Sequence, residues 1–204
     1  MFTRPFAGCM VALLALAAAA HVALAQTPPT RLRGTLAGID GNTATIATRE
    51  GSKVTVKLAD NWGVMLVSPA SMADIKENSF VGIASLKGPD GMLNALEVLV
   101  FPEAARGSGE GHYPWDLQPE SMMTNATVAT VAKASDGEML TLKYKDGTQT
   151  IRVKPGTPIV TFAPGDRADA KPGVKVFLGA TKGPDGSLSA ARLLLGKDGL
   201  TPPM

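Results

Sequence analysis

The chain of 204 residues has few of the side chains that most often carry chemistry: one cysteine, two histidines and only 5% aromatic residues. Cys9 and His21 both lie within the first 25 residues, so the rest of the chain has no thiol and a single histidine, His112. A chain without cysteine forms no disulfide, no zinc–thiolate site and no thiol nucleophile. Thiol catalysis and thiolate-bound metals are therefore excluded for residues 26–204.

An excess of charge of one sign is also lacking. The chain has 20 basic and 18 acidic residues, and without Arg4 the balance over residues 26–204 is 19 against 18, a net charge of +1. Nucleic acids are bound through a basic stripe that displaces counterions, so we expect no nucleic-acid partner. No apolar run after residue 25 is long enough to cross a bilayer, so we expect no membrane span beyond the N-terminal segment.

The first 25 residues have the pattern of a secretory signal peptide. Arg4 precedes an apolar run over residues 10–20, and an Ala-x-Ala sequence ends at Ala25. An uncleaved membrane anchor is the alternative, because residues 6–25 are almost entirely apolar. His21 and the Ala-x-Ala ending favour cleavage, so we predict a periplasmic or secreted protein.

A five-residue sequence, Lys-Gly-Pro-Asp-Gly, occurs at residues 87–91 and again at residues 182–186. Each copy lies between apolar runs, and proline, aspartate and glycine suit successive positions of a tight turn. Each copy is therefore expected to close a β-hairpin. The match continues upstream at the same spacing of 95 residues, where Pro69 corresponds to Pro164 (164 − 69 = 95). The sequence thus predicts a duplicated β unit.

The apolar pattern within each repeat predicts strands. Val54, Val56 and Leu58 alternate with polar residues, as expected of a strand with one face in a core. Each repeat is predicted to contain three strands, a short helix and two more strands, which is the order of the OB-fold. We predict a mainly β protein of two tandem five-stranded OB-like Greek-key barrels, each with a short helix between strands 3 and 4. An SH3-like small barrel is the alternative.

Residues 102–124 correspond to nothing in either repeat. Their glycines and prolines prevent long regular structure, yet the segment is too aromatic for a purely solvated linker. We expect Tyr113, Trp115 and Leu117 to dock against the barrels and to fix their relative orientation. The predicted divisions are a signal peptide (1–25), a leader (26–30), a first barrel (31–101), a connecting segment (102–124), a second barrel (125–196) and a flexible tail (197–204).

Four phrases carry a resemblance to a known family. They are Pro-Ala-Ser-x-Ala-Asp-Ile-Lys at residues 69–76, Phe-Pro-Glu at 101–103, Gly-x-Gly-His-x-Pro-Trp-Asp at 109–116 and Met-Thr-Asn-Ala-Thr-Val at 123–128. With these phrases the chain resembles a family of exported bacterial proteins, proteobacterial especially, that have tandem OB-like barrels and no known function. The resemblance implies the fold and the compartment, and it implies no activity.

The residues offer little for catalysis and only one candidate metal site. No nucleophile-elbow pattern accompanies His112, so we predict a protein that is not an enzyme, with no catalytic residues and no cofactor. A copper-type site is the alternative, because His112, Met122 and Met123 lie in one segment, and thioethers with an imidazole suit Cu(I). Against this site, adjacent residues of a strand face opposite ways.

A binding surface is the remaining hypothesis. OB barrels commonly bind chains across the face of strands 2 and 3, where the first repeat offers Lys57 and the second offers Arg152. An ordinary solvated face is the alternative explanation of these charges. We predict an exported binding or envelope-interaction module, whose natural ligand would be an anionic envelope oligosaccharide or a partner protein. Further candidate contacts with a ligand or between the barrels are His112, Tyr113, Trp115 and Asp116.

Overall fold

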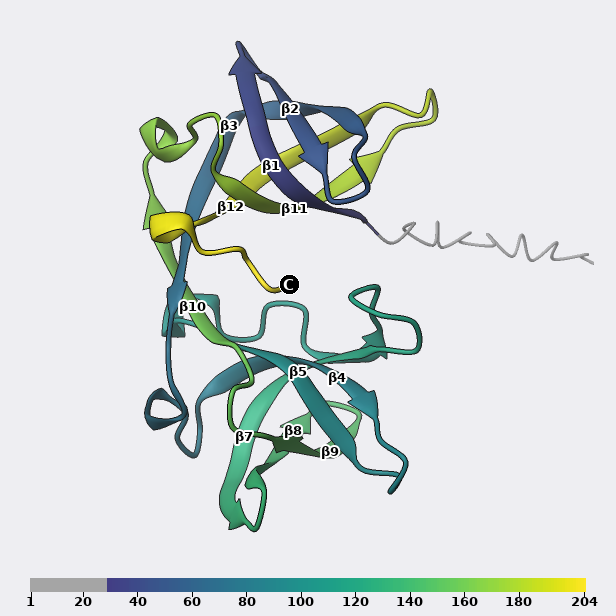
Figure 1. Cartoon of the computed structure of the whole chain (residues 1–204), viewed down its shortest axis with the longest axis vertical. Helices are drawn as coiled ribbons and strands as arrows, with labels where there is room; N and C mark the ends of the chain where they lie inside the picture. Colours follow the sequence, from purple (N-terminus) through teal and green to yellow (C-terminus); the bar gives the residue numbers. More distant parts are fainter. Residues whose placement is uncertain (1–28) are drawn as a thin grey trace, which may run out of the picture.

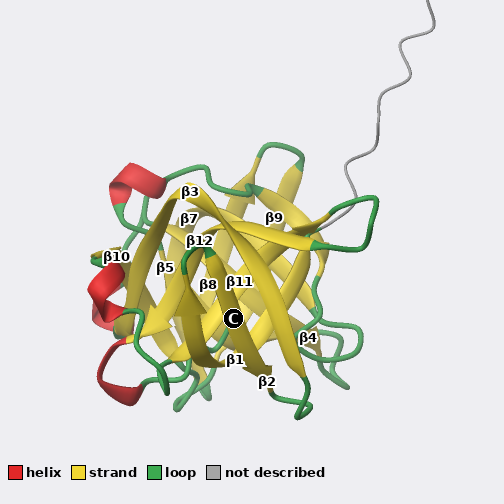
Figure 2. Cartoon of the chain, turned by 90° about the horizontal axis from the view of Figure 1, so that it is seen from above, coloured by secondary structure: helices red, strands yellow, loops and turns green. Residues whose placement is uncertain are grey.

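The computed structural model describes residues 29–204. Strands make up 60% of the described residues and helical turns 7%, so the helices serve only as connections, and the prediction of a mainly β fold is confirmed. The predicted signal peptide lies outside the described residues. The strands are arranged in two groups along the long axis of the molecule (Figure 1), and these groups overlap when viewed along that axis (Figure 2).

All the strands of the described residues belong to one hydrogen-bonded network. In chain order they are β1 (Thr30–Asp40), β2 (Thr43–Thr48), β3 (Lys53–Pro69), β4 (Phe80–Lys87), β5 (Leu93–Val100), β6 (Gly111–Pro114), β7 (Met122–Ala134), β8 (Gly137–Tyr144), β9 (Gly147–Val153), β10 (Ile159–Gly165), β11 (Lys175–Lys182) and β12 (Leu188–Gly196). Single turns of 3-10 helix occur at η1 (Met72–Asp74), η2 (Glu103–Ala105), η3 (Arg167–Asp169) and η4 (Lys197–Gly199).

The duplicated five-residue sequence forms the same hairpin turn in both places. Between β4 and β5, Gly91 has φ 80° and its N–H donates to the carbonyl of Gly88 at 2.9 Å. Between β11 and β12, Gly186 has φ 83° and its N–H donates to the carbonyl of Gly183 at 3.0 Å. Glycine adopts this positive φ without steric cost. Both predicted hairpins are confirmed, because each pair of flanking strands is antiparallel.

The first closed set of strands, which we call ring 1, combines strands from both ends of the chain. β1 pairs with β2 and β11, β3 pairs with β2 and β12, and β11 pairs with β12, so the five strands close into a barrel. Closure leaves no exposed sheet edge. Alternate apolar residues of these strands fill the interior, among them Leu36, Ile46, Val56, Leu58, Leu178, Leu193 and Leu195.

A second set of pairings, which we call ring 2, connects β4, β5, β7, β8 and β9. β7 pairs with β4 and β8, β9 pairs with β8, and β5 pairs with β4 and, over two residues, with β9. β6 adds to the outside of this set through β7. The interior contains Val81, Ile83, Val98, Val128, Leu140, Leu142 and Ile151.

Each ring therefore takes three strands from one repeat and two from the other. The prediction that residues 31–101 and 125–196 each close a barrel of their own is wrong, since β4 and β5 join ring 2 while β11 and β12 join ring 1. The physical reason is the length of β3. Its 17 residues span roughly 55 Å at 3.3 Å per residue, so β3 leaves ring 1 before the chain turns at η1. The two repeats are joined by strand exchange.

A pseudo-two-fold axis relates the repeats and passes through the antiparallel ribbon of β3 and β10. In this ribbon Pro69 pairs with Val160 and Met65 pairs with Pro164. The repeat spacing maps Met65 onto Val160 and Pro69 onto Pro164 (160 − 65 = 164 − 69 = 95), so one pair maps onto the other. The parallel pairings of β12 with β3 and of β5 with β10 obey the same relation.

The helix expected between strands 3 and 4 of each repeat is reduced to one 3-10 turn, η1 in the first repeat and η3 in the second. Both turns begin in the same way, because Ser71 N–H donates to Asp74 and Asp166 N–H donates to Asp169, each at 2.8 Å. These carboxylates satisfy N–H groups that a helix start leaves free. Within residues 29–204 no helix is long and apolar enough to cross a membrane.

Strand exchange predicts that the two halves of the chain fold only together. Fragments 26–107 and 108–204, separated between η2 and β6, each lack two strands of the ring that they begin. Mixed, they should form a 1:1 complex with one cooperative melting transition, measured by light scattering and circular dichroism. Either fragment folding alone as a monomer would contradict the exchanged connectivity.

Candidate functional site

A cavity of about 190 Å³ lies between the two rings. Its walls come from ring 1, ring 2, the β3–β10 ribbon and the connecting segment. Most of the lining side chains are apolar, and they include four aromatic rings and three thioethers: Phe101, Trp115, Phe162, Phe177, Met65, Met123 and Met204. We call this space the inter-ring cavity.

The walls of the cavity belong to a third apolar core, distinct from the interiors of the two rings. Its buried members are Val67, Leu99, Val160, Phe162, Phe177 and Met204. Phe101 packs edge-on against Phe80 and Phe162, with ring centroids 5.2 and 5.6 Å apart. Close packing of this kind holds side chains in defined rotamers, so the cavity is bounded by side chains that are held in place.

Glu97 is the one acidic residue that lines the inter-ring cavity. Its side chain is 1% exposed, and neither carboxylate oxygen has a hydrogen-bond partner among the described residues. Burial raises the pKa of Glu97 to about 7, although the positive charges of Arg33 and Arg49 act to lower it. A buried carboxylate without a partner is costly when ionised, so ionisation of Glu97 destabilises the folded protein.

A β-bulge turns Glu97 toward the cavity. Across β4 and β5, Ala84 pairs with Glu97 but the next pair is Ser85 with Ala95, so Leu96 is left over. An inserted residue shifts the alternation of side chains and re-aims those that follow. Val98 therefore points into ring 2 and Glu97 away from it. The equivalent residue of the second repeat is Arg192 (192 − 97 = 95), which also lines the cavity.

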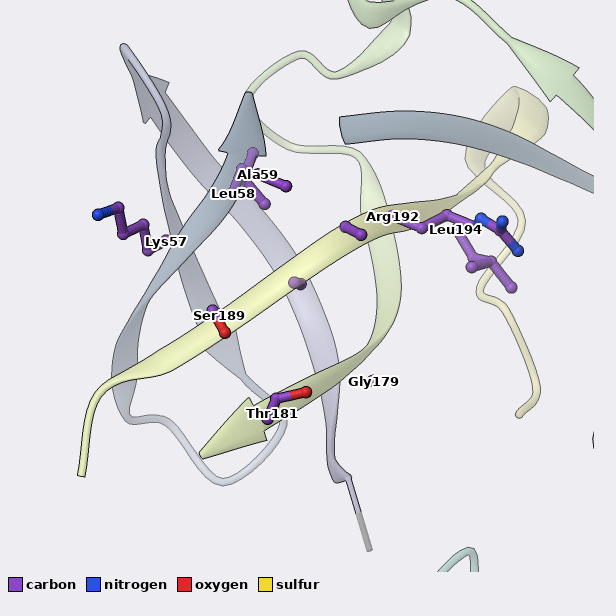
Figure 3. A pocket seen from close by; sticks show the side chains of 10 residues that line it. Lys57, Leu58, Ala59, Gly179, Thr181, Ser189, Arg192 and Leu194 are labelled. Carbon is purple, nitrogen blue, oxygen red and sulfur yellow. The ribbon is translucent and has the colours of Figure 1, made fainter. Parts of the chain in front are cut away.

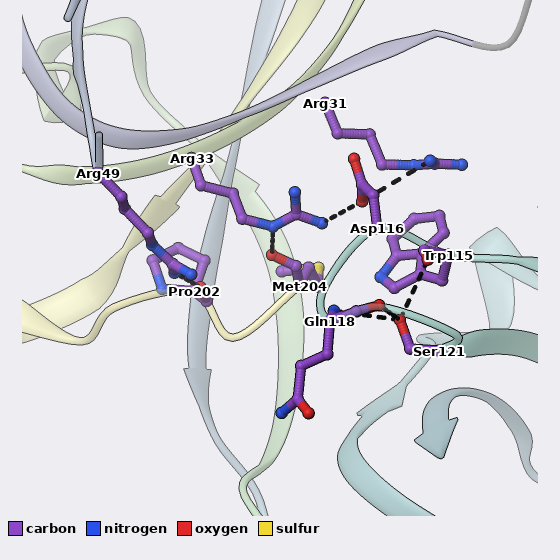
Figure 4. Close-up of polar contacts among 9 residues, drawn as sticks. All are labelled: Arg31, Arg33, Arg49, Trp115, Asp116, Gln118, Ser121, Pro202 and Met204. Atoms are coloured by element: carbon purple, nitrogen blue, oxygen red, sulfur yellow. Dashed lines mark hydrogen bonds and ion pairs between the residues drawn. The ribbon is translucent and has the colours of Figure 1, made fainter. Parts of the chain in front are cut away.

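The connecting segment joins ring 2 to ring 1 beside the cavity. The guanidinium of Arg31 lies 3.8 Å from the ring centroid of Trp115, and Asp116 accepts a hydrogen bond from Arg33 at 2.7 Å. The Ser121 hydroxyl donates to the Trp115 carbonyl at 3.1 Å and so fixes the backbone beneath the indole (Figure 4). Both arginines belong to β1, while β6 of the same segment pairs with β7.

Tyr113 packs edge-on against Trp115, with ring centroids 6.2 Å apart. The side-chain nitrogen of Asn125 lies 3.1 Å from the Tyr113 hydroxyl, and it shares its two N–H donors among this hydroxyl and two carbonyls of the preceding loop. Burial raises the pKa of Tyr113, opposed by the charge of Arg31. Leu117, expected to dock with these residues, is half-buried and belongs to none of the three apolar cores.

The structure does not bring His112, Met122 and Met123 together. His112 and Met122 line a groove on the outside of the molecule, whereas Met123 is buried and lines the inter-ring cavity. His112 Nδ1 is 2.8 Å from the hydroxyl of Thr124, and burial lowers the pKa of its imidazole. Within residues 29–204 no group of three or more histidine, cysteine, aspartate or glutamate side chains is placed to hold a metal ion.

Lys57 and Arg152 occupy equivalent positions of the two repeats but differ in their surroundings. Arg152 pairs with Asp90 at 2.9 Å and with Asp136 at 3.5 Å. Lys57 is exposed beside a groove of about 580 Å³ where β3, β11 and β12 of ring 1 meet (Figure 3). The two side chains belong to different rings, and Arg152 is already neutralised by carboxylates.

Residues 197–204, expected to form a flexible tail, pack instead against the cavity. Arg33 donates from Nε to the Met204 carbonyl, and Arg49 donates to the Pro202 carbonyl at 3.3 Å (Figure 4). The Met204 side chain is buried in the third core. Glycine and proline content predicted a flexible tail, but hydrogen bonds from Arg33 of β1 and from Arg49 hold this backbone in place.

No family model, no curated protein and no solved structure matches the chain. The resemblance to an exported tandem-barrel family therefore stays a prediction. What the site can do is derived from its own geometry, in which an apolar cavity contains one unpartnered carboxylate.

Glu97 was not among the residues that the sequence singled out. The available signal was one acidic residue in the apolar run of residues 93–100, next to Val98 and Leu99. Simple alternation places Glu97 on the same face as Leu93 and Ala95, and both of these pack against the core of ring 2. Only the bulge at Leu96, which the sequence does not mark, explains why the Glu97 carboxylate faces the inter-ring cavity.

Replacing Glu97 by glutamine should remove a pH-dependent loss of stability. The folded-state pKa of about 7 lies above the reference value of 4.5, so the folded protein keeps the proton between these values and stability falls as the pH rises from 4.5 to 7. The shift corresponds to about 3 kcal/mol at pH 8. Urea unfolding of wild type and Glu97→Gln at pH 5 to 8 measures this, and identical profiles would contradict the burial of an ionisable carboxylate.

Trp115→Ala should destabilise the protein by about 2 kcal/mol, because a half-buried indole loses its contacts with the third core and with Arg31. Leu117→Ala, two residues away, should cost less than about 1 kcal/mol, since half-buried Leu117 packs against none of the three apolar cores. Urea unfolding at pH 8 compares the two. Equal losses would show that the connecting segment is not anchored through Trp115.

Proposed function

We propose that the protein is an exported, non-enzymatic binding protein and that its binding site is the inter-ring cavity. The single observation that carries the proposal is Glu97, which is 1% exposed and has no partner for either oxygen among the described residues. Buried polar groups in proteins are almost always hydrogen-bonded. An exception inside a cavity is best explained by a partner that arrives from solution.

The rest of the lining fits a ligand site. Small-molecule sites are mostly apolar and contain a few polar groups that fix orientation. Besides Glu97, the indole Nε1 of Trp115 is buried and has no hydrogen-bond partner in the part of the chain that the structure describes. The cavity therefore offers one acceptor group and one donor within an aromatic and thioether surface.

Cost and placement support a functional origin for this arrangement. An ionised Glu97 destabilises the fold, and groups with strongly displaced pKa values concentrate at functional sites. The destabilising carboxylate lies where the two rings, the ribbon and the connecting segment converge. A leucine at this position would cost nothing of this kind, so binding accounts for the presence of the charge.

The proposal also includes the finer architecture of the two rings. In each ring, three consecutive strands of one repeat are completed by the two strands that follow the helical turn of the other repeat. This is the order of an OB-like barrel with its last two strands exchanged. We propose two such barrels, in a protein directed to the periplasm or the exterior by residues 1–25.

Two alternatives have less support. A charged surface through Lys57 and Arg152 is weakened because Arg152 already pairs with Asp90 and Asp136. Catalysis by His112 is weakened because the partner of its Nδ1 is the Thr124 hydroxyl, whereas a catalytic histidine is usually oriented by a carboxylate. The cavity is therefore the site that the geometry supports best.

Filling the cavity should abolish binding. About six water volumes fit in 190 Å³, so a panel of neutral, cationic and anionic compounds of up to about ten heavy atoms suits the site. Compounds that raise the melting temperature of the wild type should not raise that of Leu194→Trp, whose larger side chain occupies the cavity. They should still act on Ala191→Trp, an exposed position on the same strand. A panel without effect on the wild type, or with equal effects on both variants, would contradict the proposal.

A further inference from the structure

The inter-ring cavity contains one buried carboxylate, Glu97, and it has no hydrogen-bond partner among the described residues. Both oxygens of Glu97 are free to accept hydrogen bonds, and they lie in an apolar surrounding. A charge pair is strongest where water is excluded, and breaking one by leaving a single buried charge is costly. The group that best completes Glu97 is therefore a hydrogen-bond donor with positive charge.

The aromatic lining favours the same kind of group. The faces of aromatic rings carry negative charge and attract ammonium ions. Two of the cavity rings already have a guanidinium nearby, Arg31 at 3.8 Å from Trp115 and Arg33 at 5.3 Å from Phe177. Of the described residues, none places a cation over Phe101 or Phe162. These two rings remain available to a cationic ligand.

The arginines around the cavity are mostly committed elsewhere. Arg33 donates to Asp116 and to the Met204 carbonyl, and Arg49 donates to the Pro202 carbonyl. Neither forms a hydrogen bond or an ion pair with Glu97 among the described contacts. Arg192 lines the cavity with an exposed side chain and forms no ion pair within residues 29–204. Their charge favours ionised Glu97 without neutralising it directly.

We propose that the inter-ring cavity binds a small organic cation, an alkyl- or arylammonium with an apolar body, with Glu97 as its counter-ion. The inference rests on the proposed binding function and specifies the ligand class. The ammonium group hydrogen-bonds to the two Glu97 oxygens, and the body of the ligand packs on Phe101, Phe162, Leu99 and Leu194. An anionic ligand would be repelled by the same carboxylate.

A soft metal ion fits the cavity less well. The thioethers of Met65, Met123 and Met204 line it and suit Cu(I). However, a single ion uses little of a 190 Å³ space, and the unpartnered group is a hard carboxylate, which such ions do not prefer. Ag(I), which resembles Cu(I) in ligand preference, serves as a probe in the test.

Three ligands of one shape separate charge from apolar contact: cyclohexylammonium, cyclohexanol and cyclohexanecarboxylate. Calorimetric titration of the full protein at pH 8 should show the ammonium binding at least tenfold more tightly than the alcohol, since hydrogen bonds to charged groups contribute more. The carboxylate should not bind detectably. This comparison within the wild type does not depend on the folding of any variant.

Variants then locate the charge. Glu97→Gln should weaken ammonium binding at least tenfold and leave the alcohol within about threefold, whereas Glu77→Gln, at an exposed position, should change neither. Arg192→Gln should tighten ammonium binding by removing a repelling charge. Lowering the pH from 8 to 5.5 should weaken ammonium binding more than tenfold, as Glu97 becomes protonated.

The outcomes distinguish this inference from the function on which it rests. Equal binding of the ammonium and the alcohol, or unaltered ammonium binding to Glu97→Gln, would overturn the cation while leaving a binding cavity. Stabilisation by Ag(I) without any effect of the ammonium would overturn it in favour of a metal. Absence of binding by every probe would overturn both proposals.

Discussion

The structure depends on one element, the antiparallel ribbon of β3 and β10. β3 continues beyond ring 1 and pairs with its own counterpart from the second repeat, and neither repeat closes on itself. The pairing is symmetric, with Pro69 opposite Val160 and Met65 opposite Pro164, so it imposes a two-fold relation on everything attached to it. Ring closure, the contact between rings and the cavity all follow from this relation.

Symmetry of the backbone is combined with asymmetry of the side chains. Glu97 and Arg192 occupy equivalent positions and both reach the cavity, yet one is a buried acid and the other an exposed base. The connecting segment adds a second asymmetry, because its Trp115 and Asp116 contact Arg31 and Arg33 of β1. The strand pairings thus form a symmetric frame, while Glu97 and the connecting segment make its centre different on the two sides.

How far the sequence predicts this molecule depends on what each residue pattern encodes. The duplicated Pro-Asp-Gly turns and the alternation through Val54, Val56 and Leu58 identify the strands, because both depend on local geometry and burial. A barrel closed by exchanged strands has the same types of strand pairs and the same buried residues as a barrel closed within one repeat. The apolar pattern of the sequence is therefore the same for both. Glu97 was missed because a bulge alters which face a residue occupies, and the docking segment was found because its aromatic residues lack repeat counterparts.

Exchange also decides when ring 1 can form. β1 begins the described chain but has β11 as its neighbour, so that Leu32 lies opposite Leu178. Pairings so distant along the chain are slow to form, because long loops must close first. As the polypeptide emerges from a ribosome, β1 to β3 must wait for the final strands. During that interval their edges are open, and a chaperone or a second nascent copy has access to them.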